Sequence, residues 1–151
     1  MEFAPIVISF SLAPFKLADL KAILNLEQDV FPEDTYGMAE FLSLYLRGKD
    51  TFLVARAGKI IVGYIIGYVE DYSGYIASIA VDPEIRGQGL GRLLLETEMA
   101  RLHEHGARKI GLHVREDNAA AIHLYESLGF VTQDTIPDYY EGGAPALFME
   151  R

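Results

Sequence analysis

Apolar residues recur along the chain with two different periods, and the changes between them divide it into helices and strands. Spacings of three and four residues predict helices, whereas dense β-branched and aromatic runs bounded by turn residues predict strands. The predicted helices cover residues 17–30, 38–46, 90–105 and 119–128. The predicted strands cover residues 6–12, 51–57, 59–70, 75–81, 109–114, 130–135 and 146–149. This order predicts one α/β domain over residues 1–151, with a mixed sheet of about seven strands and about four helices.

Glycine, proline and asparagine mark the ends of several of these elements. Pro14 is expected to end the first strand, and Gly58 joins two neighbouring strands into an antiparallel hairpin. Asn118 is a good N-cap for the last helix, since its side chain can accept a bond from a free amide. Gly106 and Gly129 follow the last two helices, in the position where a left-handed residue ends a helix.

Composition and charge exclude several classes of protein. The chain has no cysteine, which excludes a disulfide frame, a thiolate nucleophile and a cysteine-ligated metal. Its net charge of −9 disfavours nucleic acid and favours cationic partners. Apart from His113, the chain has three histidines, His103, His105 and His123. They are not spaced for a metal site, and we expect none. No apolar run approaches the roughly 20 residues of a membrane span, so we expect a soluble, cytoplasmic protein with no membrane partner.

A glycine-rich loop between residues 86 and 92 connects a predicted strand directly to a predicted helix. Successive amides at a helix N-terminus bind phosphate oxygens, and Arg86 and Arg92 add positive charge. A P-loop would need lysine and then serine or threonine where Arg92 and Leu93 stand, and a dinucleotide fold would need glycine at position 92. The loop therefore predicts another phosphate-bearing ligand, and its alternative is a helix-start turn that binds nothing.

Two motifs follow one another in the second half of the chain. The first reads Val81-Asp82-Pro83-x-x-Arg86-Gly87-x-Gly89-x-Gly91, followed by Leu93-Leu94. The second reads Leu112-His113-Val114-Arg115, Asn118-x-Ala120-Ala121 and Leu124-Tyr125-x-x-x-Gly129-Phe130. Together they resemble motifs of the GNAT N-acetyltransferases, in the N-terminal acetyltransferase branch that includes RimI-like and archaeal enzymes, and the first resembles the acetyl-CoA-binding segment. The resemblance covers about residues 51–149 and implies the GNAT fold, in which the fourth and fifth strands splay apart.

The resemblance also implies an acetyl-CoA site. The loop amides would hold the pyrophosphate, the edge of the fourth strand would pair with the pantetheine arm, and Asn118 would hydrogen-bond to the same region. Tyr125 would lie near the sulfur. The residues that the resemblance assigns to this site are Ile79, Ala80, Val81, Arg86, Gly87, Gln88, Gly89, Leu90, Gly91, Arg92, Asn118 and Tyr125.

Three residues are candidates for proton transfer. Tyr125 would donate a proton to the departing thiolate, although its position on an apolar helix face equally fits a core tyrosine. His113 alternates with apolar neighbours and lies beside Gly111, where we expect open space; it is either the general base or a structural histidine. Relatives in the branch place a glutamate in a turn matched by Phe31-Pro32-Glu33, so Glu33 is a second candidate base or amine ligand, or else a solvated carboxylate.

The acceptor is expected to be a cationic amine. Tyr139 and Tyr140 resemble the substrate-gripping tyrosines of the family, and loop aromatics can also simply cover the core. An α-amine titrates near 7.7 and a lysine near 10.4, so a weak base suits a peptide N-terminus. We therefore expect transfer to the N-terminal α-amine of a protein, such as a ribosomal protein, by a monomer or homodimer. The alternatives are a small amine such as a polyamine or antibiotic, or a sensor that binds acyl-CoA without turnover.

Overall fold

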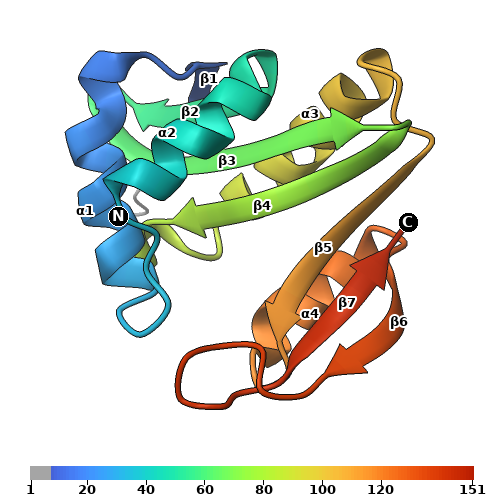
Figure 1. Ribbon diagram of the computed structural model, residues 1–151. Helices are drawn as coiled ribbons and strands as arrows, with labels where there is room; N and C mark the ends of the chain where they lie inside the picture. Colours follow the sequence, from blue (N-terminus) through green and yellow to red (C-terminus); the bar gives the residue numbers. More distant parts are fainter. Residues whose placement is uncertain (1–7) are drawn as a thin grey trace, which may run out of the picture.

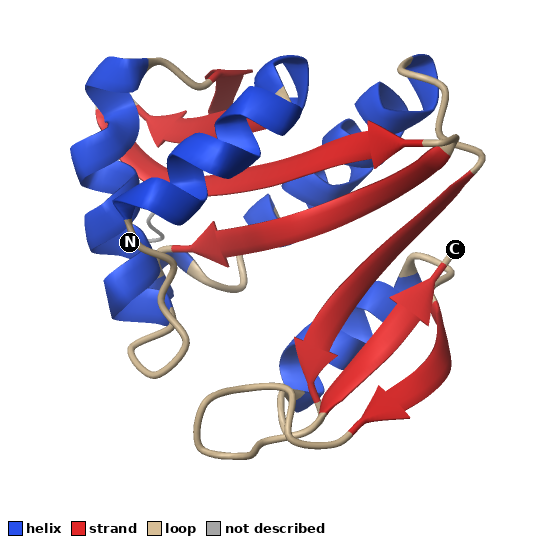
Figure 2. Cartoon of the chain, in the orientation of Figure 1, coloured by secondary structure: helices blue, strands red, loops and turns tan. Residues whose placement is uncertain are grey.

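A mixed sheet of seven strands forms the centre of the computed structural model, which describes residues 8–151 (Figures 1 and 2). The strands lie in the order β1-β2-β3-β4-β5-β7-β6, and β4 and β5 are parallel while the other neighbours are antiparallel. The strands are β1 (Ser11–Pro14), β2 (Phe52–Ala57), β3 (Ile60–Glu70), β4 (Ser73–Val81), β5 (Lys109–Arg115), β6 (Val131–Ile136) and β7 (Ala146–Glu150). The helices are α1 (Leu20–Val30), α2 (Met38–Arg47), α3 (Leu90–Glu104) and α4 (Ala119–Ser127), with short 3₁₀ turns at Leu17–Asp19, Lys49–Thr51 and Pro83–Ile85. The predicted α/β architecture is confirmed.

The first strand is the element whose predicted bounds differ most from the structure. It was expected over residues 6–12, of which 1–7 lie outside the described residues, and the structure begins the strand at Ser11. Pro14 is its last residue rather than the residue that stops it, and pairs with Leu53 of β2. Proline is tolerated there because β1 is an edge strand, where a missing amide costs no ladder bond on the open side.

Each face of the sheet carries its own apolar core. Helices α1 and α2 cover one face through an aromatic-rich cluster that includes Phe41, Phe52 and Tyr64. Helices α3 and α4 cover the other face through a mainly aliphatic cluster that includes Leu94 and Ile110. Because successive strand residues point to opposite faces, the two clusters share the same strands. These are the α1/α2 face and the α3/α4 face of the sheet.

Among residues 8–151, every helix is too short or too polar to cross a bilayer.

Strands β4 and β5 stay together for only a short distance. They pair from Ser73 with Lys109 to Ile76 with Leu112 and then diverge (Figure 2). A bulge lies at the same point, because Ile76 and Ser78 pair with consecutive residues of β3 and Ala77 has no partner of its own. A bulge bends its strand and increases its twist. The last part of β4, residues 77–81, is thus turned away from β5 and has no strand partner on that side within the described chain.

Glu98 is a buried carboxyl in the core between α3 and the sheet. Its side chain is fully buried and lies against Gly67 of β3, where an added Cβ would come within 3.4 Å of Oε2. Neither carboxyl oxygen has a hydrogen-bond partner among residues 8–151. Burial therefore raises the pKa of Glu98 to about 9, and the folded protein keeps this group protonated at neutral pH.

We predict that Glu98→Gln stabilises the protein more at pH 8 than at pH 5. Between the ordinary carboxyl pKa of 4.5 and about 9, the folded state holds a proton that the unfolded state has lost, so wild-type stability falls as pH rises. Each pH unit contributes up to about 1.4 kcal/mol, or up to about 4 kcal/mol between pH 5 and pH 8. Urea unfolding of both proteins at the two pH values measures the difference. The control is Glu104→Gln, an exposed position on the same helix; an equal gain for Glu98→Gln at both pH values would contradict the prediction.

Candidate active site

The glycine loop before α3 forms one side of the site. Gly87 and Gly89 have φ angles of 82° and 85°, in the left-handed region that favours glycine, and a Cβ at either would meet no atom within 4 Å. The loop therefore needs glycine for its backbone conformation and leaves open space beside it. Gly89 is the N-cap of α3 and makes no side-chain cap, so the amides of the first turn point outward without a capping partner. This geometry fits an anion such as pyrophosphate.

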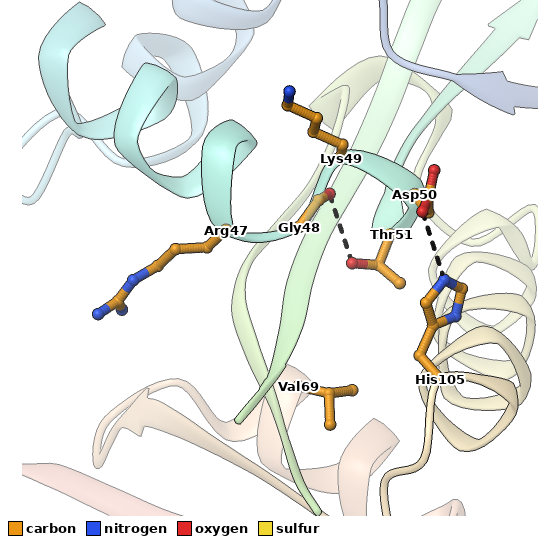
Figure 3. A pocket seen from close by; sticks show the side chains of 7 residues that line it. All are labelled: Arg47, Gly48, Lys49, Asp50, Thr51, Val69 and His105. Carbon is orange, nitrogen blue, oxygen red and sulfur yellow. Dashed lines mark hydrogen bonds and ion pairs between the residues drawn. The ribbon is translucent and has the colours of Figure 1, made fainter. Parts of the chain in front are cut away.

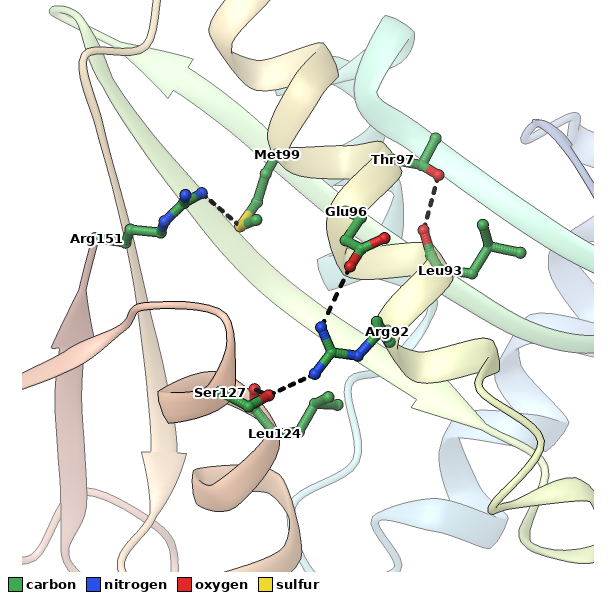
Figure 4. A network of polar contacts seen from close by, with 8 residues as sticks. All are labelled: Arg92, Leu93, Glu96, Thr97, Met99, Leu124, Ser127 and Arg151. Atoms are coloured by element: carbon green, nitrogen blue, oxygen red, sulfur yellow. Dashed lines mark hydrogen bonds and ion pairs between the residues drawn. The ribbon is translucent and has the colours of Figure 1, made fainter.

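Two residues of the same motif have packing contacts. An added Cβ at Gly91 would lie 3.3 Å from Leu124, so glycine lets α3 approach α4 closely. The Arg92 guanidinium lies 3.3 Å from Glu96 and donates to the Ser127 hydroxyl at 2.8 Å, which links the two helices (Figure 4). Glu96 thus offsets part of the Arg92 charge, and Arg86 is the exposed cation of the loop.

Asn118, the N-cap of α4, and Tyr125 within α4 are two residues that the resemblance assigns to the acetyl-CoA site. Asn118 Oδ1 accepts a bond from the Ala121 amide at 3.2 Å, which confirms the predicted N-cap. Tyr125 is 7% exposed and its ring packs edge-on against Phe130. Its hydroxyl makes no hydrogen bond to a described residue, and burial raises its pKa to about 12. The hydroxyl is therefore protonated at neutral pH. The binding roles of both residues stay predictions.

His113 lies on β5 immediately after the last pair with β4. Its Nδ1 is 2.6 Å from the Tyr75 hydroxyl, and its ring stacks on Tyr139 with centroids 4.7 Å apart and planes 13° apart. Burial lowers the pKa of the imidazole below its ordinary value, which favours the unprotonated form. The structure thus brings together two predicted site residues, His113 and Tyr139, that are far apart in sequence.

The expectation of open space beside Gly111 was wrong. The pairing of β5 with β7 places Phe148 opposite His113, and an added Cβ at Gly111 would lie 2.8 Å from the Phe148 ring. The missing side chain makes room for this ring rather than for a ligand. Phe148 and Tyr139 both pack against the imidazole, with ring centroids 5.1 Å and 4.7 Å away, and so restrict its orientation.

Tyr75 is a site residue that sequence reasoning missed. It lies on β4, and its pairing with Gly111 brings its hydroxyl to the histidine two residues further along β5. Burial, reinforced by Tyr139, raises the pKa of Tyr75, so its hydroxyl stays protonated. In the sequence it is one aromatic residue in an alternating strand. Tyr75 is identified as a site residue by the register of the parallel β4–β5 pair, which cannot be read from the sequence.

The other predicted acceptor residues gather around Arg115, which follows His113 by two positions on the same strand. The Glu33 carboxylate is 79% exposed and lies 3.9 Å from the guanidinium. The guanidinium also lies over the Tyr140 ring at 5.3 Å, and Tyr140 packs edge-on against Tyr139. Glu33, Tyr139 and Tyr140 thus surround the α1/α2 side of the opening, whereas Tyr125 lies in the core of the α3/α4 face.

A separate pocket of about 150 Å³ lies at the C-terminal end of α2 (Figure 3). Its polar lining includes a contact of 3.6 Å between His105 and Asp50. None of the predicted site residues lines it. Its lining residues are Arg47, Gly48, Lys49, Asp50, Thr51, Val69 and His105.

Comparison with known proteins gives consistent matches. Residues 20–130 match the model of the acetyltransferase (GNAT) family. An uncharacterized N-acetyltransferase of Methanocaldococcus jannaschii, MJ1530, is 35% identical over 138 residues, which span 89% of this chain and 86% of that protein. The ribosomal-protein-S18-alanine N-acetyltransferase of Escherichia coli superposes with a TM-score of 0.82 at 30% identity, covering 94% of this chain and 92% of that one. Arabidopsis thaliana Naa50, in complex with the bisubstrate analogue CoA-Ac-MVNAL, gives 0.84 at 26% identity, with coverages of 95% and 99%.

We predict that Gly89→Asp weakens acetyl-CoA binding by at least about tenfold, because it places a carboxylate where a phosphate would meet the first turn of α3. Calorimetric titration with acetyl-CoA measures the change. Gly58→Asp is a matched control: Gly58 also has a positive φ, of 62°, and open space for a Cβ, but it lies in the β2–β3 turn. Equal affinities of the two variants would show that the loop does not hold the diphosphate.

Proposed function

The chain belongs to the GNAT acetyltransferase family, and from this premise we propose that it acetylates the N-terminal α-amine of a protein. It is an acetyl-CoA-dependent N-acetyltransferase. The observation that carries the choice of acceptor is the unprotonated imidazole of His113, held by Tyr75 and Tyr139 at the opening between β4 and β5. Two similar proteins support the same class of acceptor. The Escherichia coli protein is a ribosomal-protein-S18-alanine N-acetyltransferase, and Arabidopsis thaliana Naa50 was solved with the bisubstrate analogue CoA-Ac-MVNAL.

The described residues fit acetyl-CoA on the β4 side of the opening. The uncapped amides from Gly87 to Arg92 would hold the pyrophosphate. The free edge at Ile79–Val81 would pair with the pantetheine amides, and the Asn118 side-chain amide would bond nearby. Bound acetyl-CoA supplies an acetyl thioester that the amine nitrogen attacks. The gap in the sheet would then lead from the cofactor side to the acceptor side.

The proposed base is His113. An α-amine is about 2.7 pKa units more acidic than a lysine amine, which corresponds to about 3.7 kcal/mol at 1.36 kcal/mol per unit. A weak base therefore suits the α-amine. The step requires the tautomer in which Nδ1–H donates to the Tyr75 hydroxyl oxygen, since Nε2 then carries no proton and can accept one from the amine, directly or through water. Stacking on Tyr139 restricts rotation of the imidazole ring and so keeps Nε2 in one orientation.

The proposed acid is Tyr125. Its raised pKa keeps the hydroxyl protonated at neutral pH, and no described residue uses this hydroxyl in a hydrogen bond. It would donate to the sulfur as the thioester breaks. Acid and base would thus act from opposite faces of the sheet, and neither would neutralise the other.

The proposed role of Glu33 is to bind the incoming ammonium. Its exposed carboxylate beside Arg115 lies at the rim where a peptide would enter, with Tyr139 and Tyr140 opposite. An overall charge of −9 attracts cationic N-termini to the protein. The two tyrosines would contact the first residues of the bound peptide.

Mass spectrometry of a peptide library tests the proposed acceptor. Each peptide contains an internal lysine and is presented both with a free N-terminus and with that amine blocked; spermidine is included as a small amine. We expect one added acetyl group at the α-amine of free peptides and none on the blocked set. Acetylation of blocked peptides, or of spermidine alone, would overturn the proposal. No transfer to any amine, with acetyl-CoA still bound, would favour a sensor.

The pH profile of turnover tests the assignment of the base. Burial lowers the pKa of His113, so its unprotonated form persists below pH 6.5. The decrease of kcat on the acid side of the profile, its acid limb, is therefore expected below pH 6.5. We predict that His113→Ala removes this limb and lowers kcat by about a hundredfold. Glu33→Gln should instead raise the KM for peptide and keep the limb. Loss of the limb in Glu33→Gln alone would transfer the role of base to Glu33.

A further inference from the structure

The loop between α1 and α2 contacts both of the strands that diverge at the site. On β4, the Tyr36 hydroxyl donates to the Ala77 carbonyl at 3.4 Å. On β5, the Arg115 guanidinium donates to Asp34 Oδ2 at 2.7 Å. Ala77 and Arg115 both lie beyond the last β4–β5 pair. Residues 34–36 therefore bridge a part of the sheet where strand pairing has stopped.

The Asp34–Arg115 contact is better shielded than an ordinary surface ion pair. The two side chains are 14% and 25% exposed. Oδ1 of Asp34 is buried and has no partner among residues 8–151, so Arg115 is the group that compensates the charge of this carboxylate. Loss of Arg115 would leave the Asp34 carboxylate buried and uncompensated, which makes the loop position depend on the contact.

Arg115 also contacts Asp117, but that contact cannot bridge the gap. Asp117 Oδ1 lies 3.2 Å from the guanidinium Nε, in the turn that follows the same strand, and its side chain is 73% exposed. Asp34 is 81 positions away in sequence. Asp34 and Asp117 thus bind the same guanidinium, but Asp34 connects β5 to the α1–α2 loop, whereas Asp117 connects β5 only to its own following turn.

The other side of the loop is held by a buried carboxylate of α1. Glu27 Oε1 accepts a bond from the Tyr36 amide at 3.1 Å. The same carboxyl accepts from the Tyr64 hydroxyl of β3, and Ser78 of β4 lies 3.5 Å away. Tyr36 is therefore anchored through both its backbone and its hydroxyl. Asp34 makes the shorter contact of the loop with β5, at 2.7 Å, and the exposed Glu33 carboxylate lies 3.9 Å from the same guanidinium.

We propose that Asp34 and Arg115 are positioning residues whose ion pair, together with Tyr36, ties β5 to β4 across the opening and so fixes its width. The width matters because His113 lies on β5, two residues before Arg115, whereas β4 carries the proposed pantetheine edge. A misplacement of about 1 Å between reacting groups can cost about a hundredfold in rate. In its consequence for catalysis, this inference rests on the proposed function; the bridging contact itself does not.

The width of the opening can be measured in the free protein by electron paramagnetic resonance. The chain has no cysteine, so Glu84→Cys and Glu116→Cys give two specific spin-label sites, both exposed, after β4 and after β5. We expect Asp34→Ala to broaden and lengthen the distance distribution, whereas Asp117→Ala leaves it unchanged. Tyr36→Phe, which keeps the ring but removes the β4 contact, should broaden it as well and serves if Asp34→Ala does not fold.

Steady-state kinetics with a free-N-terminus peptide provide the second measurement. Asp34→Ala should lower kcat/KM for the peptide by about tenfold and leave the KM for acetyl-CoA unchanged. Asp117→Ala should match wild type, and Arg115→Lys should recover part of the loss seen in Arg115→Ala. An unchanged distance distribution in Asp34→Ala, or equal effects of Asp34→Ala and Asp117→Ala, would overturn the inference. A protein that transfers acetyl to no peptide would refute the proposed function, while the distance measurement would still decide the bridging contact.

Discussion

The short pairing of β4 with β5 is the constraint on which the rest of the structure depends. The two strands share a ladder only as far as Ile76 and Leu112, and the bulge at Ala77 then turns β4 away. A sheet that continued to pair here would use every edge group of β4 in its own ladder. Because pairing stops, residues 77–81 keep a free edge, and the turn at Pro83–Ile85 and the glycine loop lead from this edge into α3. The opening and the anion-binding turn are therefore consequences of one backbone feature.

Burial assigns opposite roles to the two kinds of titratable group at the opening. Desolvation disfavours whichever form carries charge, so it raises the pKa of a tyrosine and lowers that of a histidine. Tyr75 and Tyr125 are thereby kept protonated, and His113 is kept unprotonated. A proton donor and a proton acceptor thus coexist at neutral pH without a nearby charge to tune either one. The Glu33 carboxylate lies at the rim, where it is 79% exposed to water.

Local signals in the sequence predicted most elements and the whole of the glycine loop, because periodicity, caps and turn residues act over a few positions. Asn118 caps α4, and Gly87 and Gly89 adopt the left-handed conformation, as such signals indicate. Contacts between distant segments could not be predicted in this way. The bond from Tyr75 to His113 depends on the parallel register, and the ring of Phe148 fills the space at Gly111 because of the pairing with β7.

A glycine beside the bulge also bears on the contact between the histidine and its tyrosine. Gly67 stands opposite the bulge on β3, and an added Cβ there would lie 2.6 Å from the Tyr75 carbonyl oxygen. Any larger residue would force this carbonyl, and with it the Tyr75 backbone, away from β3. The Tyr75 hydroxyl would then lose its distance of 2.6 Å to His113 Nδ1. A glycine on a strand that carries none of the predicted site residues is thus required for the geometry of the proposed base, through the same irregularity that opens the sheet.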